Sequence, residues 1–274
     1  MNKKKYIILF TKIFLSFALP IAITGYFKYY ERKIASKKNF INLQKELINN
    51  FSEAIIKNPN NYFFYIERGK AKQYLGNYKG AINDFNYALK INPDKRFIFF
   101  RANAKFDFGD YVGAIKDYDK LSSMKYFKEQ VFFNIASSQL LNFQYEDAIS
   151  SYTKSIKYDQ EDYSAFLNRG NAKFKNMDYL GSLDDFNKSI KLNKQSYVTF
   201  NNRGVSKFKL RNFTAALKDF EKSLKINPLN YNTLYNQALT NFELKDNKKA
   251  CIDLKRSIKL GKEVFEEEYS KICN

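Results

Sequence analysis

The pattern of hydrophobic and polar positions repeats along most of the chain. Apolar residues recur three and four apart in short segments, a spacing that predicts paired amphipathic helices. Each expected pair carries one small residue in its first helix and one in its second. The first set is Gly69, Ala102, Ala136, Gly170, Gly204 and Ala238, and the second is Ala81, Ala114, Ala148, Ser182, Ala216 and Ala250. Both sets advance by 34 residues, with one step of 33, so the sequence predicts six helical hairpins.

Aromatic side chains accompany the small residues at fixed positions. One set follows the turn of each hairpin, at Tyr78, Tyr111, Tyr145, Tyr179 and Phe213. A second set lies further into the second helix, at Phe85, Tyr118, Tyr152, Phe186 and Phe220. Small residues let two helix backbones approach closely where they cross, and the aromatic rings fill the space around them. A single hairpin cannot bury its own apolar face, so we expect the hairpins to stack.

These positions resemble the tetratricopeptide repeat, a 34-residue pattern of small, aromatic and Pro positions. The resemblance covers residues 62–264 as six units, at 62–94, 95–128, 129–162, 163–196, 197–230 and 231–264. It implies an all-α, right-handed superhelical solenoid of antiparallel helix hairpins, with the first helices on the concave face. The sixth unit departs most, with Asn247 and Leu254 in place of aromatic residues. We interpret residues 28–61 as a degenerate capping repeat and connector, and residues 265–274 as a C-terminal cap or tail.

The resemblance also implies a groove for a partner protein or extended peptide. Its polar candidates are Asn134, Asn168, Asn202 and Asn236, with Asn103 and Asn171, and its aromatic candidates are Phe106, Phe174, Phe208 and Phe242. An amide offers both a donor and an acceptor to a peptide backbone. The alternative for the Asn set is a bond to a helix end of the neighbouring repeat, and the alternative for the Phe set is packing in the core between repeats.

Charged residues show a second regularity inside the repeats. The first, second, fourth and fifth units carry Arg and Lys four apart on the first helix, and each also carries Asp on the second helix. The third unit lacks all three, with Ile135, Gln139 and Ser151 in their places. We therefore predict that Asp pairs with Arg or Lys across each hairpin. The sixth unit is an exception, because Asp253 faces Gln237 and Asn241.

The N-terminus is apolar over residues 6–27, apart from Lys12, and follows Lys3, Lys4 and Lys5. About 22 residues suffice to cross a hydrocarbon core of about 30 Å. We therefore expect residues 1–27 to form an apolar helix that anchors the chain as a single-pass membrane protein, with its orientation open. The alternatives are a cleaved signal peptide, which would make the protein secreted, periplasmic or lumenal, and a peripheral or buried helix.

The amino-acid composition excludes several kinds of catalytic and metal site. The chain has no His, which removes His-dependent nucleophiles and His metal sites, and we expect no cofactor, no metal and no catalytic residues. Its two Cys residues do not make a disulfide framework, and Cys251 replaces Ile or Leu of other repeats, which suggests a small buried apolar side chain. The net charge of +19 admits an acidic partner, anionic lipid or RNA. We favour a membrane-tethered protein-interaction scaffold over an enzyme and over the alternative of an RNA-binding helical-repeat protein.

Overall fold

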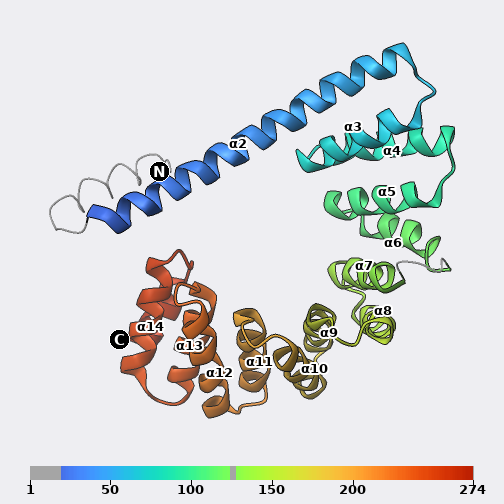
Figure 1. Ribbon diagram of the computed structural model, residues 1–274. Helices are drawn as coiled ribbons and strands as arrows, with labels where there is room; N and C mark the ends of the chain where they lie inside the picture. The colour runs from blue at the N-terminus through green and yellow to red at the C-terminus, as the bar shows by residue number, and fades with distance from the viewer. Residues whose placement is uncertain (1–19, 124–127, 274) are drawn as a thin grey trace. The chain divides into compact units, whose positions relative to one another are not determined.

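The computed structural model describes residues 20–123 and 128–273, with side chains from residue 36 onward (Figure 1). This part of the chain is helical and forms two compact units, Met1–Asn92 and Pro93–Asn274. The first unit holds α2 (Pro20–Lys57), α3 (Tyr62–Tyr74) and α4 (Tyr78–Ile91). The second holds α5 (Lys95–Phe108), α6 (Tyr111–Asp119), α7 (Lys128–Leu141), α8 (Tyr145–Tyr158), α9 (Tyr163–Lys175), α10 (Tyr179–Leu192), α11 (Tyr197–Lys209), α12 (Phe213–Ile226), α13 (Tyr231–Glu243), α14 (Asn247–Lys259) and α15 (Glu266–Cys273).

Helix ends follow local rules that the sequence carries. Most helices begin after an Asn, Asp or Ser whose side chain accepts a hydrogen bond from a backbone N–H of the first turn, as Asn212 does at α12 and Asp246 at α14. Each first helix from α3 to α13 ends at a left-handed residue that starts the turn. Gly76 and Gly109 take this conformation in the first two repeats, and Phe143, Met177, Arg211 and Lys245 take it in the next four.

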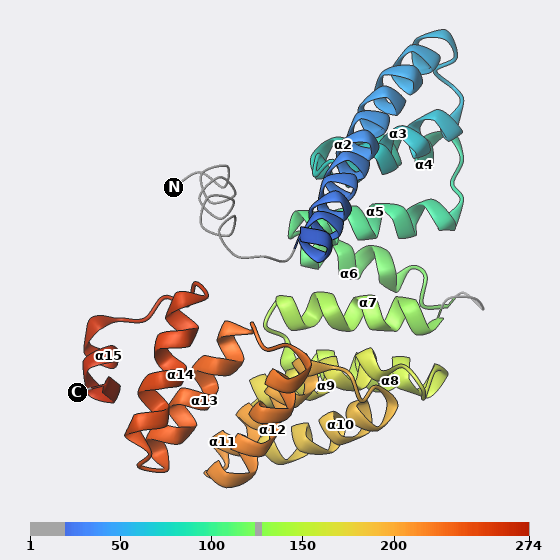
Figure 2. The same cartoon turned by 60° about the vertical axis from the view of Figure 1, so that its left-hand side comes forward.

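The helices pack as consecutive antiparallel pairs, which Figure 2 shows for α5–α14 in the second unit. Where the two helices of a pair cross, the small residue of the first helix faces an aromatic ring of the second. Gly69, Gly170 and Gly204 lie against the rings of Phe85, Phe186 and Phe220, which are fully buried. This arrangement confirms the predicted all-α solenoid of antiparallel helix hairpins.

Hydrogen bonds also join the two ends of four of the hairpins. In the third to sixth repeats a buried Ser of the second helix donates to a backbone carbonyl at the start of the first helix. The pairs are Ser155 with Glu129, Ser189 with Tyr163, Ser223 with Tyr197 and Ser257 with Tyr231. These positions therefore need a hydroxyl as well as a small side chain.

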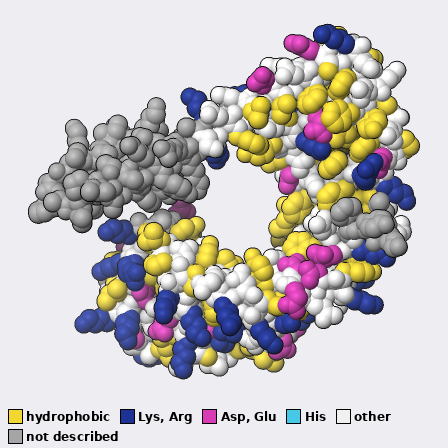
Figure 3. All heavy atoms as spheres, viewed as in Figure 1, with side chains coloured by type: hydrophobic (Ala, Val, Ile, Leu, Met, Phe, Trp, Pro, Cys, Tyr) yellow, Lys and Arg dark blue, Asp and Glu magenta, His cyan; other side chains and the backbone are white. Residues whose placement is uncertain are grey.

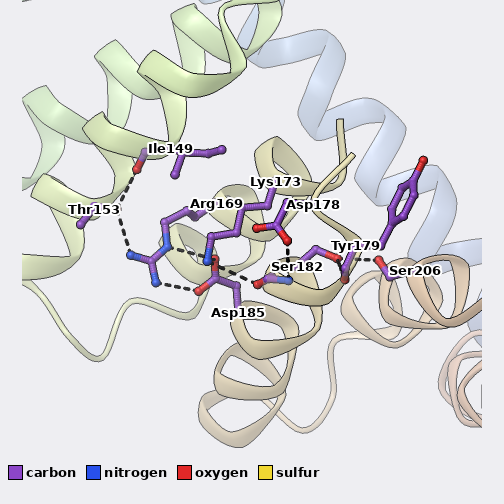
Figure 4. A network of polar contacts seen from close by, with 10 residues as sticks. Ile149, Thr153, Arg169, Lys173, Asp178, Tyr179, Ser182, Asp185 and Ser206 are labelled. Atoms are coloured by element: carbon purple, nitrogen blue, oxygen red, sulfur yellow. Dashed lines mark hydrogen bonds and ion pairs between the residues drawn. The ribbon is translucent and has the colours of Figure 1, made fainter. Parts of the chain in front are cut away.

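The predicted ion pairs across the hairpins are confirmed. Arg68, Arg101, Arg169 and Arg203 reach Asp84, Asp117, Asp185 and Asp219 with Nη2–Oδ1 distances of 2.6–2.7 Å. Lys72, Lys105, Lys173 and Lys207 reach the second oxygen of the same carboxylates at 2.7–2.9 Å. Figure 4 shows the fourth repeat, where Arg169 also donates from Nη1 to Thr153 of the preceding repeat. We call each Arg–Lys–Asp set a clamp.

The predicted single-pass membrane location is wrong. Among residues 20–123 and 128–273, no helix has both the length and the apolar character that crossing a bilayer requires. Residues 1–19 of the expected anchor lie outside the described part of the chain.

The interpretation of Cys251 as a small buried apolar residue is also wrong. Cys251 of α14 forms a disulfide with Cys273 of α15, and both residues are half-buried. Sequence reasoning missed the bond because Cys273 lies beyond the repeats, in the segment whose packing the period does not specify.

Candidate functional site

One concavity of the second unit lies along its first helices. Helices α7, α9, α11 and α13 contact one another in sequence, which places them on the same side of this unit. Between them is a pocket of about 510 Å³ that we call the central pocket. It is lined by Leu140, Leu141, Phe143, Tyr145, Asn171, Phe174, Lys175, Phe186, Asn202 and Val205. Three of the predicted groove residues, Asn171, Phe174 and Asn202, therefore lie together here.

Phe143 stands at the rim of the central pocket in an unfavourable state. Its φ is 61°, in the left-handed region, and its side chain is 78% exposed. The first two repeats place Gly76 and Gly109 at this turn position, where Gly carries no steric cost. A bulky residue in this conformation costs about 1–2 kcal/mol. An exposed aromatic ring held in a strained turn beside a pocket points to a binding role.

The predicted asparagines form a chain of side-chain amides across three first helices. Asn236 donates to Asn201, Asn201 to Asn202, Asn202 to Asn171, and Asn171 to Asn168, at 2.8–3.5 Å. We call these five residues the asparagine relay. Further along the unit, Asn134 donates to Asn103, which also accepts from the Tyr118 hydroxyl. The inter-repeat bonds therefore join side-chain amides of neighbouring first helices and do not reach a helix end of the neighbouring repeat.

The relay does not exhaust the hydrogen-bonding capacity of these amides. Each Asn side chain has two donor hydrogens and two acceptor lone pairs, and the relay uses part of them. All five residues are half-buried, so water or a ligand can reach the remaining groups. The relay therefore orients a row of amides while leaving donors and acceptors for a second partner.

The predicted Phe set mostly packs inside its own hairpins. Phe106, Phe174 and Phe208 contact the aromatic residue five positions later, with ring centroids 5.7, 5.2 and 5.3 Å apart. Phe242 packs at the C-terminal end, where the Lys271 ammonium lies 5.7 Å from its ring centroid. Of this set only Phe174 lines the central pocket.

A second pocket, of about 290 Å³, opens near the amino ends of α7 and α9 and is lined by Asn134 among others. We call it the acidic pocket, because Glu129 and Asp162 also line it. Partial burial raises the pKa of Glu129, and the negative charges of Asp159 and Asp162 raise it further. A cation bound at this pocket would relieve that repulsion.

Sequence reasoning missed one member of the asparagine relay and one residue of the central pocket. Asn201 precedes Asn202 and joins the relay, but it stands outside the 34-residue Asn series. Phe143 could have been found from its turn position, where a bulky apolar residue replaces the Gly of earlier repeats. Within the described residues, no group of three or more His, Cys, Asp or Glu is placed to hold a metal ion.

Comparison with known families identifies the repeats. Models of the tetratricopeptide repeat match residues 66–122, 129–162 and 197–230. These segments cover parts of both units, so tetratricopeptide repeats are present, as the sequence pattern predicted. No curated protein matches the chain significantly.

Solved structures support the same fold at low sequence identity. A repeat protein from Cytophaga hutchinsonii is 18% identical, with a TM-score of 0.67 over 84% of this chain and 95% of its own. One from Parabacteroides merdae ATCC 43184 is 18% identical, with a TM-score of 0.63 over 90% and 98%. YrrB, described as having an unusual peptide-binding site, is 18% identical, with a TM-score of 0.55 over 67% and 95%.

Proposed function

We propose that this tetratricopeptide-repeat chain is a protein-interaction scaffold that binds an extended segment of a partner protein along α7, α9, α11 and α13. The observation that carries the proposal is Phe143, an exposed aromatic residue kept in a strained turn at the rim of an apolar pocket. The peptide-binding site named for YrrB, a protein of the same fold, supports the proposal.

The pockets suggest the chemistry of the segment. An apolar side chain of the partner fills the central pocket, between Leu140, Phe174 and Val205, and contacts Phe143. The partner's backbone bonds to the remaining donors and acceptors of the asparagine relay. A Lys or Arg placed further along the segment meets Glu129 and Asp162 in the acidic pocket. We therefore favour a partner segment with apolar and basic residues over the acidic partner that the net charge suggested.

Selection from a displayed peptide library tests the proposal, with the purified chain as target and Phe143→Gly as the decisive variant. Gly relieves the left-handed strain and removes the ring. We expect this variant to be as stable as the parent or more stable, yet to bind the selected peptides at least tenfold more weakly, because a buried aromatic anchor contributes about 1.4 kcal/mol or more.

Lys245→Gly is the matched control. Lys245 occupies the same turn position three repeats later, with φ 64°, and does not line the central pocket. This variant should gain similar stability and keep peptide binding. Equal binding by the parent and Phe143→Gly would refute the proposed site, as would selected peptides that lack an apolar residue common to them all.

A further inference from the structure

Helix α15 covers the apolar end of the second unit. Ile272 packs against Ala238, Ala250 and Leu254, and the Tyr235 hydroxyl donates to Glu268 of α15 at 2.5 Å. In this structure α15 takes the place of a next repeat on the outer apolar face of the sixth hairpin, a face that needs a cover. Eight residues are too few for a helix that is stable alone, so α15 depends on these contacts and on its disulfide.

The disulfide lies in an open cleft between α14 and α15. Cys251 and Cys273 line this cleft of about 370 Å³ together with Lys248, Ile252 and Lys255, among others. Figure 2 shows α15 beside α14. Because both sulfur-bearing residues are half-buried and border the cleft, a small thiol can approach the S–S bond from solvent.

Two lysines give the cleft a positive charge beside Cys251. Lys248 lies three residues before Cys251 and Lys255 four after it, so all three share one face of α14. The ion pairs of α14 are Lys249 with Asp246 and Arg256 with Asp253. Among the described residues, neither Lys248 nor Lys255 pairs with a carboxylate. Lys and Arg side chains also gather over the segment from α10 to α14 in Figure 3.

We propose that this cleft is a thiol-exchange site for an anionic low-molecular-weight thiol, and that exchange there releases α15. The lysines concentrate an anionic thiol at the cleft. They also stabilise the Cys251 thiolate, which makes Cys251 the better leaving group. The inference stands on the cleft, its charge and the cap, and is independent of the proposed peptide groove.

The chemistry takes two steps and balances without a further reagent. The thiolate of the first small thiol attacks Cys273 Sγ, the S–S bond breaks, and its electron pair leaves on Cys251 Sγ. A second small thiolate then attacks the small-molecule sulfur of the mixed disulfide and displaces the Cys273 thiolate. The protein disulfide gains two electrons, and two small thiols are oxidised to one disulfide.

Opening the disulfide changes which surface the chain presents. Without the covalent bond, α15 is held by the packing of Ile272 and Tyr269, the Tyr235–Glu268 hydrogen bond and the contact of Lys271 with Phe242. These contacts involve few residues, so we expect α15 to detach in a large share of reduced molecules. Detachment uncovers Phe242 and the apolar end of the array.

The charge of the cleft is tested on the full-length disulfide form with two probe thiols, anionic glutathione and cationic cysteamine. Disulfide opening is followed by alkylation of the freed thiols and mass spectrometry. The variant Lys248→Gln/Lys255→Gln should lower the rate with glutathione about threefold or more and should not lower the rate with cysteamine. The control Lys191→Gln/Lys225→Gln removes two exposed lysines of α10 and α12 that do not line the cleft, and should match the parent. Equal glutathione rates in all three proteins would overturn the site.

The release of α15 has its own readout. Hydrogen exchange of residues 264–273 should accelerate at least tenfold after glutathione treatment, and exchange in α9–α12 should stay unchanged. Cys251→Ser/Cys273→Ser, which cannot form the bond, should show the fast exchange without any thiol. If residues 264–273 keep their protection in the reduced chain and in this variant, the disulfide does not control the cap.

Discussion

Replacing Gly204 by Ala tests how closely the helices of one hairpin approach. An ideal Cβ on Gly204 would lie 2.6 Å from Cε1 and 2.9 Å from Cδ1 of Phe220. Phe220 is fully buried, so its ring cannot swing into solvent to make room. Accommodating the methyl group therefore requires the two helices to separate or the ring to leave its rotamer.

Two opposing effects set the size of the change. Ala in a helix interior is favoured over Gly by about 0.8–1.0 kcal/mol. Overpacking a well-filled core costs about 1–3 kcal/mol, and this contact lies at the severe end because two ring atoms fall under 3.0 Å. We therefore expect Gly204→Ala to lose about 1–2 kcal/mol of unfolding free energy, and Gly204→Leu to lose more.

Urea unfolding followed by circular dichroism measures the loss, and hydrogen exchange should place it in α11 and α12. The sixth repeat supplies a rescue, because it pairs Ala238 with Leu254 at the same two positions. Gly204→Ala combined with Phe220→Leu installs that pair. The double variant should therefore lose less unfolding free energy than the two single variants lose together. Strictly additive changes, or an unchanged midpoint for Gly204→Ala, would refute the close approach.

Four further predictions concern the clamps and the corresponding Asp253 of the sixth repeat. A double-mutant cycle on Arg203→Ala and Asp219→Ala, measured by urea unfolding, should give a coupling free energy above the roughly 1 kcal/mol of an exposed pair, because the Asp219 side chain is 3% exposed. A coupling free energy near zero would contradict a stabilising clamp. Burial acts to raise the pKa of Asp117, but hydrogen bonds from Arg101 and Lys105 outweigh burial and lower it. The contribution of Asp117 to the free energy of unfolding should therefore be complete above about pH 4 and be lost as pH falls through the pKa of the folded state. Burial raises the pKa of Asp253, so its ionised form destabilises the folded chain at pH 7. In urea unfolding at pH 7, Asp117→Asn should therefore lower the free energy of unfolding and Asp253→Asn should raise it. Gln237→Arg should place a guanidinium where Gln237 Oε1 is now buried without a hydrogen-bond partner, and should lower the pKa of Asp253 as followed by NMR titration.

The repeated positions were predictable because each is set by a local rule applied six times. Small residues at helix crossings and aromatic residues around them follow from the period alone. The clamps were found by comparing repeats, since the Arg, Lys and Asp positions disappear together in the third one. Such a comparison works because the three side chains meet within a single hairpin, whose geometry is the same in every repeat.

Other features depend on geometry that the period does not contain. The spacing put the asparagines on one face, but whether an amide turns to its neighbour or to a ligand depends on distances between adjacent repeats. The turn position of Phe143 was recognisable from the Gly of earlier repeats, but the pocket beside it depends on how neighbouring repeats pack. The disulfide joins α14 to α15, beyond the last full repeat.

The third repeat differs from most other repeats at several positions. Together these differences indicate a lower local stability beside the central pocket. Like the sixth repeat it has no clamp, here with Ile135, Gln139 and Ser151 at the three positions, and Gln139 Oε1 is buried without a hydrogen-bond partner. Its left-handed turn residue is an exposed aromatic, Phe143, where the other repeats have Gly, Met, Arg or Lys. In a solenoid, stability is a sum over repeats and their interfaces, so a repeat without these contacts opens more readily than its neighbours. We expect the backbone amide hydrogens of α7 and α8 to exchange faster than those of α9 to α12. Because this repeat opens more readily, we also expect the rim of the central pocket to adapt to its ligand. Uniform protection from α7 to α12 would mean that Ile135 packing makes up for the missing clamp, and that the rim is as rigid as the rest of the unit.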